Sequence, residues 1–147
     1  MNIIFAADHA GYELKNVLLA YVRDELGYEV FDCGAHIMDD TDDYTTFVGR
    51  AADMVSKNTE HSRAIILGGS GQGEAIYANR FKGVRAAVFY GGSLDVVRLS
   101  REHNDANVLS LGARFLDEET AKEAVSLWLK TEFSTEPRYA RRNTAMG

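Results

Sequence analysis

The chain has 147 residues and a formal net charge of −6, with 46% hydrophobic and 26% charged residues. These values fit one globular domain over residues 1–147, and the acidic charge argues against nucleic acids and anionic membranes as partners. No apolar run approaches the roughly 20 residues that cross a bilayer, and the single cysteine, Cys33, excludes an internal disulfide framework and predicts a reducing, cytoplasmic location.

Short apolar runs alternate with segments of helical period along the chain. The predicted strands cover residues 3–7, 28–32, 64–68, 85–90 and 107–112. The predicted helices fall at 14–22, 44–55, 73–81, 92–104 and 121–129, with a C-terminal helix from about 136. The strands are apolar throughout, as strands covered on both faces are. This alternation predicts an α/β fold: a doubly wound, five-stranded parallel sheet in a Rossmann-like three-layer sandwich.

Ligands of such sheets bind beyond the carboxyl ends of the strands, so the loops that follow the strands are the candidate sites. The first loop is ADHAG, which contains Asp8 and His9. The second, residues 33–43, carries four aspartates: Asp39, Asp40, Asp42 and Asp43. This acidic run suits either a divalent ion or a solvated loop, and the absence of any other ligand pattern favours the solvated loop. The four histidines also lack a metal-binding spacing, so no metal is expected.

The third loop, GGSGQGE at residues 68–74, fails three familiar patterns. It lacks the GxGxxG of a dinucleotide site, the terminal Gly-Lys-Ser/Thr of a P-loop and the GxSxG of a nucleophile elbow. The last failure argues against a serine hydrolase built on Ser70. A nucleotide-binding regulatory module remains an alternative, because glycine amides also cradle phosphates.

The glycine loop nevertheless predicts an anion-binding nest. Glycines allow a close approach of main-chain N–H groups, and a helix is expected to begin near Gly73 with its free amides facing the same point. Glu74 would repel a permanent anion there. It is either an N-terminal residue favoured by the helix dipole or a base that creates the anion during the reaction. The second interpretation fits an aldose–ketose isomerase, in which oriented donors stabilise an enediolate.

Five motifs together carry a resemblance to a known family. ADHAG (7–11), GGSGQGE (68–74), REHNDAN (101–107), LGAR (111–114) and PRYARR (137–142) resemble ribose-5-phosphate isomerases of the B type, a family that includes galactose-6-phosphate isomerase subunits. The motifs occur in order over essentially the whole chain. The resemblance implies a homodimer, no metal or other cofactor, and interconversion of ribose 5-phosphate and ribulose 5-phosphate. An isomerase of hexose 6-phosphates, galactose or allose, is the alternative within this class.

The resemblance also implies a role for individual residues. Glu74 would be the base and His103 the acid that opens the sugar ring, with Ser70 adding a hydroxyl donor to the anion hole. The substrate-binding residues would be Asp8, His9, Gly69, Gly71, Gln72, Gly73 and Asn104. The phosphate would be held by Arg114, Arg138 and Arg142, with His9 also within reach of it.

The two C-terminal arginines have an alternative interpretation. Arg138 and Arg142 stand at i and i+4 after Pro137, so they share one face of a helix, either as a solvated tail or as forked phosphate donors. Because this helix is terminal, we expect the active site to be shared between the two subunits.

Three positions distinguish the chain within the family. One branch uses a cysteine base at the position of Gly68, so this chain resembles the branch whose base is Glu74. Thr45 and Tyr139 stand where the family often has proline and histidine, respectively.

Overall fold

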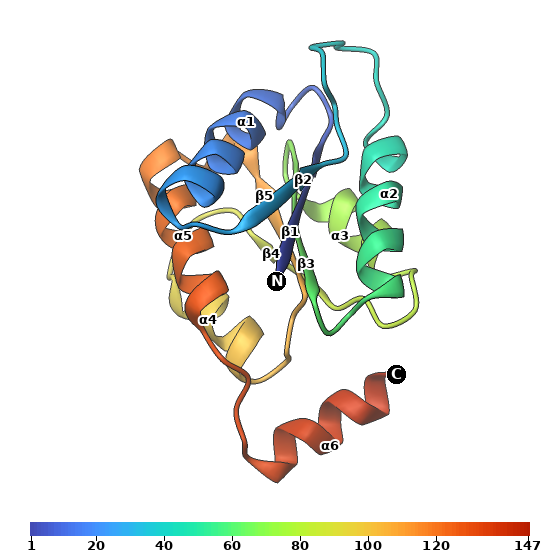
Figure 1. Ribbon diagram of the computed structural model, residues 1–147, viewed down its shortest axis with the longest axis vertical. Coiled ribbons are helices and arrows are strands. Elements are labelled where there is room, and N and C mark those ends of the chain that lie inside the picture. The colour runs from blue at the N-terminus through green and yellow to red at the C-terminus, as the bar shows by residue number, and fades with distance from the viewer.

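The computed structural model describes residues 1–147 and contains a five-stranded sheet in which every pairing is parallel (Figure 1). The strand order is β2-β1-β3-β5-β4. The strands are β1 (Asn2–Ala7), β2 (Glu29–Asp32), β3 (Ser62–Gly68), β4 (Ala86–Phe89) and β5 (Val108–Gly112). The predicted fold class is confirmed, and each strand lies within two residues of its predicted bounds.

Helices cover both faces of the sheet. They are α1 (Tyr12–Ala20), α2 (Tyr44–Lys57), α3 (Gln72–Ala78), α4 (Asp95–Glu102), α5 (Glu118–Lys130) and α6 (Pro137–Met146). A π-helical turn at Tyr21–Glu25 extends α1, and a single 3-10 turn, Ala113–Phe115, follows β5. In Figure 1, α1, α4 and α5 lie on one side of the sheet and α2 and α3 on the other, while α6 stands apart beyond its far end.

Alternation along the central strands divides the core in two. In β1, Ile3 and Phe5 face the cluster formed with α1, α4 and α5, whereas Ile4 and Ala6 face the cluster formed with α2 and α3. This follows from the two-residue period of a strand, which sends successive side chains to opposite faces. Burial on both faces explains why β1, β3 and β5 are apolar along most of their length.

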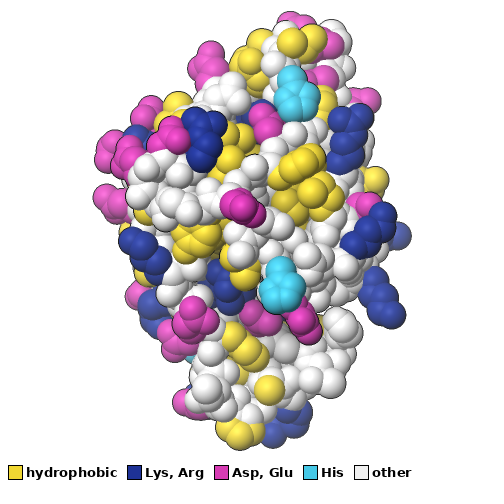
Figure 2. All heavy atoms as spheres, in the orientation of Figure 1, with side chains coloured by type: hydrophobic (Ala, Val, Ile, Leu, Met, Phe, Trp, Pro, Cys, Tyr) yellow, Lys and Arg dark blue, Asp and Glu magenta, His cyan; other side chains and the backbone are white.

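The edge strands depart from the expectation that all five strands are covered on both faces. Residues of β2 alternate between exposed and half-buried, and the Phe31 side chain is 54% exposed. Three of the four residues of β4 are only half-buried. An edge strand has one paired neighbour, and here the helices pack mainly over the centre of the sheet. Figure 2 shows hydrophobic side chains gathered on the face that β2 borders.

The loop between β2 and α2 projects beyond the carboxyl ends of the strands (Figure 1). Its base is fixed by Lys15, which is fully buried and donates to both carboxylate oxygens of Asp32, at 2.8 and 2.9 Å, and to the carbonyl of Ala35 at 2.7 Å. A buried ammonium group is tolerated only with such partners. Ile37 and Met38 of this loop are exposed. Figure 2 shows hydrophobic and acidic side chains next to each other at the end of the molecule where the loop projects.

None of the helices has the length and apolar character that crossing a membrane requires.

Candidate active site

The sheet topology brings three of the predicted loops together. Strands β1, β3 and β5 are adjacent in the centre of the sheet, so the loops after their carboxyl ends meet at one edge. This edge carries most of the predicted site: Asp8, His9, Gly69, Ser70, Gly71, Gln72, Gly73, Glu74 and Arg114.

The carboxyl group of Glu74 lies directly against the main chain of Gly68. A Cβ atom built on Gly68 would stand 1.7 Å from Glu74 Oε1 and 2.1 Å from its Cδ. The residue is 4% exposed, although it lies in the first turn of a helix that starts at Gln72. Glycine at position 68 therefore makes room for the acid, and any other residue there would displace it.

The environment of Glu74 favours the protonated acid. Burial raises the pKa of Glu74, and the nearby charge of Asp8 raises it further, while a hydrogen bond from its own main chain acts in the opposite direction. Asp8 is itself buried and accepts a hydrogen bond from the main-chain N of Ala10 at 3.0 Å. The edge thus holds two buried carboxyl groups, one of which is a stronger base than an exposed glutamate.

Contacts with the end of β5 hold the glycine loop in place. The Ser110 hydroxyl is fully buried and donates to the carbonyl of Gly71 at 2.6 Å, and the Arg114 amide donates to the carbonyl of Gly69 at 3.1 Å. Gly71 has a φ of 77°, which is a left-handed conformation that suits glycine. A Cβ on Gly112 would lie 2.7 Å from the carbonyl oxygen of Ser70. The segment LGAR thus supports the loop through its main chain as well as supplying Arg114.

Two basic side chains, Arg114 and His9, border the loop. Arg114 is exposed, and its Nη1 would lie 2.9 Å from a Cβ built on Gly69. His9 donates its main-chain N to Asp42 Oδ1 at 3.0 Å, and its ring Nδ1 lies 2.7 Å from the same oxygen. Arg114 and His9 are close enough for the guanidinium to lower the pKa of His9, although the hydrogen bond to Asp42 outweighs this and the net direction is upward.

The contact with Asp42 corrects one sequence-based interpretation. The acidic loop was expected to be solvated, yet the Asp42 side chain is only 10% exposed. The other three aspartates, Asp39, Asp40 and Asp43, are exposed as expected. Asp8, His9 and Asp42 bring ligand atoms within 4.8 Å of one another, a spacing that could hold a metal ion. In the structure, however, the ring nitrogen of His9 that faces Asp42 is engaged in a hydrogen bond.

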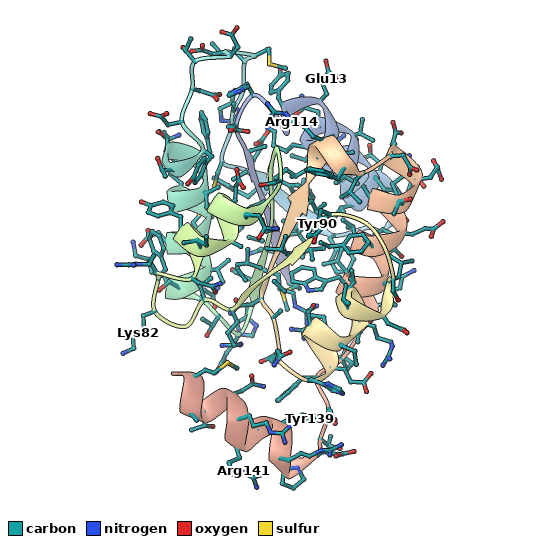
Figure 3. All side chains as sticks on the ribbon, turned by 180° about the vertical axis from the view of Figure 1, so that it is seen from behind. Glu13, Lys82, Tyr90, Arg114, Tyr139 and Arg141 are labelled. Atoms are coloured by element: carbon teal, nitrogen blue, oxygen red, sulfur yellow. The ribbon has the colours of Figure 1, made fainter.

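The remaining predicted residues lie at the opposite end of the sheet. His103 ends α4, Asn104 follows it, and both precede β5; Arg138 and Arg142 lie on α6. Figure 3 shows this separation, with Arg114 near one end of the molecule and Tyr139 and Arg141 on α6 at the other. Within one chain, therefore, His103, Asn104 and the two helix arginines do not meet Glu74.

Side-chain contacts surround His103 in this second group. The His103 ring stacks on Tyr139, with centroids 4.1 Å apart and planes 14° from parallel. Asn143 donates to the carbonyl of His103 at 3.1 Å, and Arg138 lies over the Tyr139 ring while pairing with Glu136 at 2.8 Å. The contacts of His103 with Tyr139 and Asn143 attach α6 to the end of α4. Tyrosine at position 139 thus provides an aromatic surface for the histidine.

Other residues of REHNDAN build the turn that presents His103. Arg101 is 3% exposed and donates to Asp105 Oδ1 at 2.8 Å and to the carbonyl of Ala106 at 2.7 Å. Arg85 donates to the second oxygen of Asp105 at 3.0 Å. Asp105 has a φ of 47°, a left-handed conformation that aspartate tolerates better than most residues. The motif thus combines His103 and Asn104, which reach the surface, with a buried arginine, Arg101, that stabilises the turn through Asp105.

Sequence reasoning missed Asp42, Ser110, Arg101 and Asp105. The two members of REHNDAN lay inside a recognised motif and could have been assigned a supporting role. Ser110 is the only hydroxyl residue in an apolar strand, and this offered a weak signal of a buried hydrogen bond. Nothing in the sequence separated Asp42 from its three neighbours.

The chain was also compared with known proteins. The family model described as Ribose/Galactose Isomerase matches residues 3–146. The ribose-5-phosphate isomerase B of Mycolicibacterium paratuberculosis is 37% identical, over 97% of this chain and 87% of the relative. The structure of ribose 5-phosphate isomerase B from Anaplasma phagocytophilum has a TM-score of 0.90 at 40% identity, covering 99% of this chain and 96% of that one. A Mycoplasma genitalium ribose-5-phosphate isomerase B with bound ribulose-5-phosphate has a TM-score of 0.93 at 34% identity, over 99% and 93% of the two chains.

Replacing Asp8 with asparagine tests the coupling of the two buried carboxyl groups. Asparagine keeps an acceptor for the Ala10 amide but removes the neighbouring negative charge, so the Asp8→Asn variant should have a lower pKa at Glu74 than the unmodified protein. The measurement is a titration of the Glu74 carboxyl carbon by NMR. Asp24→Asn, in an exposed pair with Arg23, is the control and should leave the titration unchanged. A Glu74 that titrates like a free glutamate in the unmodified protein would contradict this description.

Proposed function

The chain belongs to the ribose/galactose isomerase family, and from this premise we propose that it interconverts ribose 5-phosphate and ribulose 5-phosphate. The observation that carries the proposal is the buried Glu74 carboxyl group beside a loop of main-chain N–H groups. The activity of the curated relatives and the ribulose-5-phosphate bound to the Mycoplasma genitalium protein support this substrate class.

Glu74 acts as the base in this proposal. Its carboxylate takes the proton from carbon 2 of the open-chain aldose, and the electron pair left behind forms the double bond of an enediolate. N–H groups of the loop Gly69–Gly73 stabilise the negative charge that develops on the sugar oxygens, with the Ser70 hydroxyl as a further donor. Transfer of the hydroxyl proton from oxygen 2 to oxygen 1, together with return of the first proton to carbon 1, gives the ketose. The raised pKa of Glu74 suits a group that both takes and returns a proton.

The remaining roles depend on a second copy of the chain. We place Asp8 and Asn104 on the sugar hydroxyls, His103 at the ring oxygen as the acid that opens the furanose, and Arg114, Arg138 and Arg142 on the phosphate. Since His103 and α6 lie at the far end of the sheet from Glu74, they complete a site only when a partner subunit supplies them. A two-fold dimer with antiparallel sheets meets this requirement twice, once for each site.

Exposed hydrophobic side chains support such a dimer. Ile76 on α3 is 67% exposed, Tyr90 after β4 is 54% exposed and Phe115 after β5 is 63% exposed, and the rings of Tyr90 and Phe115 pack edge to face. Such side chains near the carboxyl edge of the sheet suit an interface between subunits.

In this proposal the whole chain forms one isomerase domain, which works without a metal or other cofactor. A cytoplasmic location fits its single, buried thiol.

Glu74→Gln tests the base directly. The amide keeps the size of the side chain but cannot accept the proton, so kcat for ribose 5-phosphate should fall by about a factor of 1,000 while the fold persists. Gly68→Ala should fall comparably, because its methyl group takes the position of the carboxyl group. Glu13→Gln, an exposed acid at the start of α1, is the control. Full activity of Glu74→Gln would refute the assignment, and a higher kcat/KM for galactose 6-phosphate would move the substrate to the hexose class.

Purified heterodimers test whether the site is shared. A dimer of one Glu74→Gln chain and one Arg142→Ala chain has one site with both residues intact, so it should show about half the wild-type activity although each homodimer is nearly inactive. A dimer of a wild-type chain and a chain with both substitutions is the matched control. If sites are shared, neither of its sites is intact and it should be nearly inactive. The reverse pattern would show that each chain forms its own site.

A further inference from the structure

The acidic loop delivers one buried carboxylate to the candidate active site. Asp42 comes from a position 33 residues away from His9, and its Oδ1 accepts hydrogen bonds from both the main chain and the ring of that histidine. Its Oδ2 is also buried and has no hydrogen-bond partner. The loop neighbour Asp39, by contrast, accepts hydrogen bonds from Thr41 within the loop itself.

We propose that Asp42 is a positioning residue that orients His9 and holds it as a cation which binds the phosphate group of the substrate. The inference rests on the proposed function, because that function supplies a phosphorylated sugar. It adds a residue of the acidic loop to the machinery of the site.

The two hydrogen bonds fix the orientation of the imidazole. Because the Asp42 carboxylate only accepts, Nδ1 of His9 carries the proton of this hydrogen bond. Nε2 is then the ring nitrogen that is left to bind a ligand. The bond from the main-chain N of His9 to the same oxygen also holds the start of the β1–α1 loop. The ring is therefore oriented before any ligand binds.

The charges around His9 favour the imidazolium. The hydrogen bond to Asp42 is the largest cause of the raised pKa of His9, the charges of Asp8 and Asp42 add to it, and partial burial and Arg114 oppose it. Asp39 also faces the ring, since His9 in turn lowers the pKa of that aspartate. The buried Asp42 carboxylate has only His9 as a partner, and a buried charge is costly unless an opposite charge compensates it. A neutral histidine would leave it uncompensated.

The start of the loop is attached to α1. Lys15 connects α1 to Asp32 and Ala35, the two residues on either side of the start of the loop, through three buried or half-buried hydrogen bonds. The loop returns to the sheet edge through the hydrogen bonds between Asp42 and His9. The start of the loop, and Asp42 near its end, are thus both attached to elements at the site edge.

A cationic His9 completes an anion site on this chain. Arg114 lies across the glycine loop, and its charge is felt at His9. A phosphate dianion placed between the two would relieve their mutual repulsion and gain a charge-assisted hydrogen bond from each. Free imidazole titrates near neutrality, so without Asp42 this contribution would be lost within the working pH range.

Asp42→Asn tests the inference because asparagine can accept the same two hydrogen bonds but carries no charge. The imidazole C2–H resonance of His9, assigned by its loss in His9→Asn, should titrate at lower pH in Asp42→Asn than in the unmodified protein. Phosphate binding by His9 is present below its pKa and is lost as the pH rises through it. The KM for ribose 5-phosphate should therefore start to rise at lower pH in the variant, reaching about tenfold above wild type at slightly alkaline pH with kcat little changed.

Asp40→Asn, an exposed aspartate of the same loop, is the matched control and should leave both measurements unchanged. The shift of the His9 resonance on adding inorganic phosphate provides a readout that needs no turnover. If the wild-type protein does not turn over ribose 5-phosphate, the proposed function fails, and the NMR titrations still decide the role of Asp42. An unchanged His9 titration in Asp42→Asn overturns the inference. So does a shifted titration with an unchanged pH dependence of KM and of phosphate binding.

Discussion

The position of the Glu74 carboxyl group depends on the absence of a side chain at Gly68. Gly68 ends the central strand β3, and the absence of a side chain there lets Glu74 fold back from the next helix until its carboxyl group touches the main chain. Burial then raises the pKa of the acid beside the glycine loop. In the branch for which the resemblance implies a cysteine at this position, the thiol would occupy the same volume. The two branches would then deliver a base to one point from opposite ends of the loop.

The polarity of a parallel sheet explains why one chain alone does not bring the proposed site residues together. Loops that follow strands gather at one edge, whereas the α4–β5 turn and α6 lie at the other, and the strands separate them (Figure 1). Buried polar contacts support both edges of the sheet. Ser110 donates to the glycine loop at one edge, and Arg101 pairs with Asp105 in the His103 turn at the other. Two ordered half-sites at opposite edges are understandable if each is half of a site completed by a partner.

The sequence predicted the sheet, its helices and the glycine loop because each has a local signal, namely alternation, helical period or glycine spacing. It also predicted that Asp8 and Glu74 lie at one edge, since a parallel sheet places the loops after adjacent strands together. Asp42 could not be distinguished from its neighbours, because its burial depends on a contact with His9 that no local pattern encodes. The half-exposed β2 was misjudged for a similar reason: an apolar strand does not reveal that it lies at the edge of the sheet.

The central claim is that Glu74 moves the proton between the two sugar carbons, and hydrogen exchange with solvent measures that step most directly. Ribulose 5-phosphate incubated with the enzyme in deuterium oxide should gain deuterium at carbon 1, followed by NMR or mass spectrometry. We expect the wild-type protein to catalyse this exchange and Glu74→Gln to show none above the uncatalysed rate. Exchange by Glu74→Gln at the wild-type rate would contradict the account, because another group would then be removing the proton.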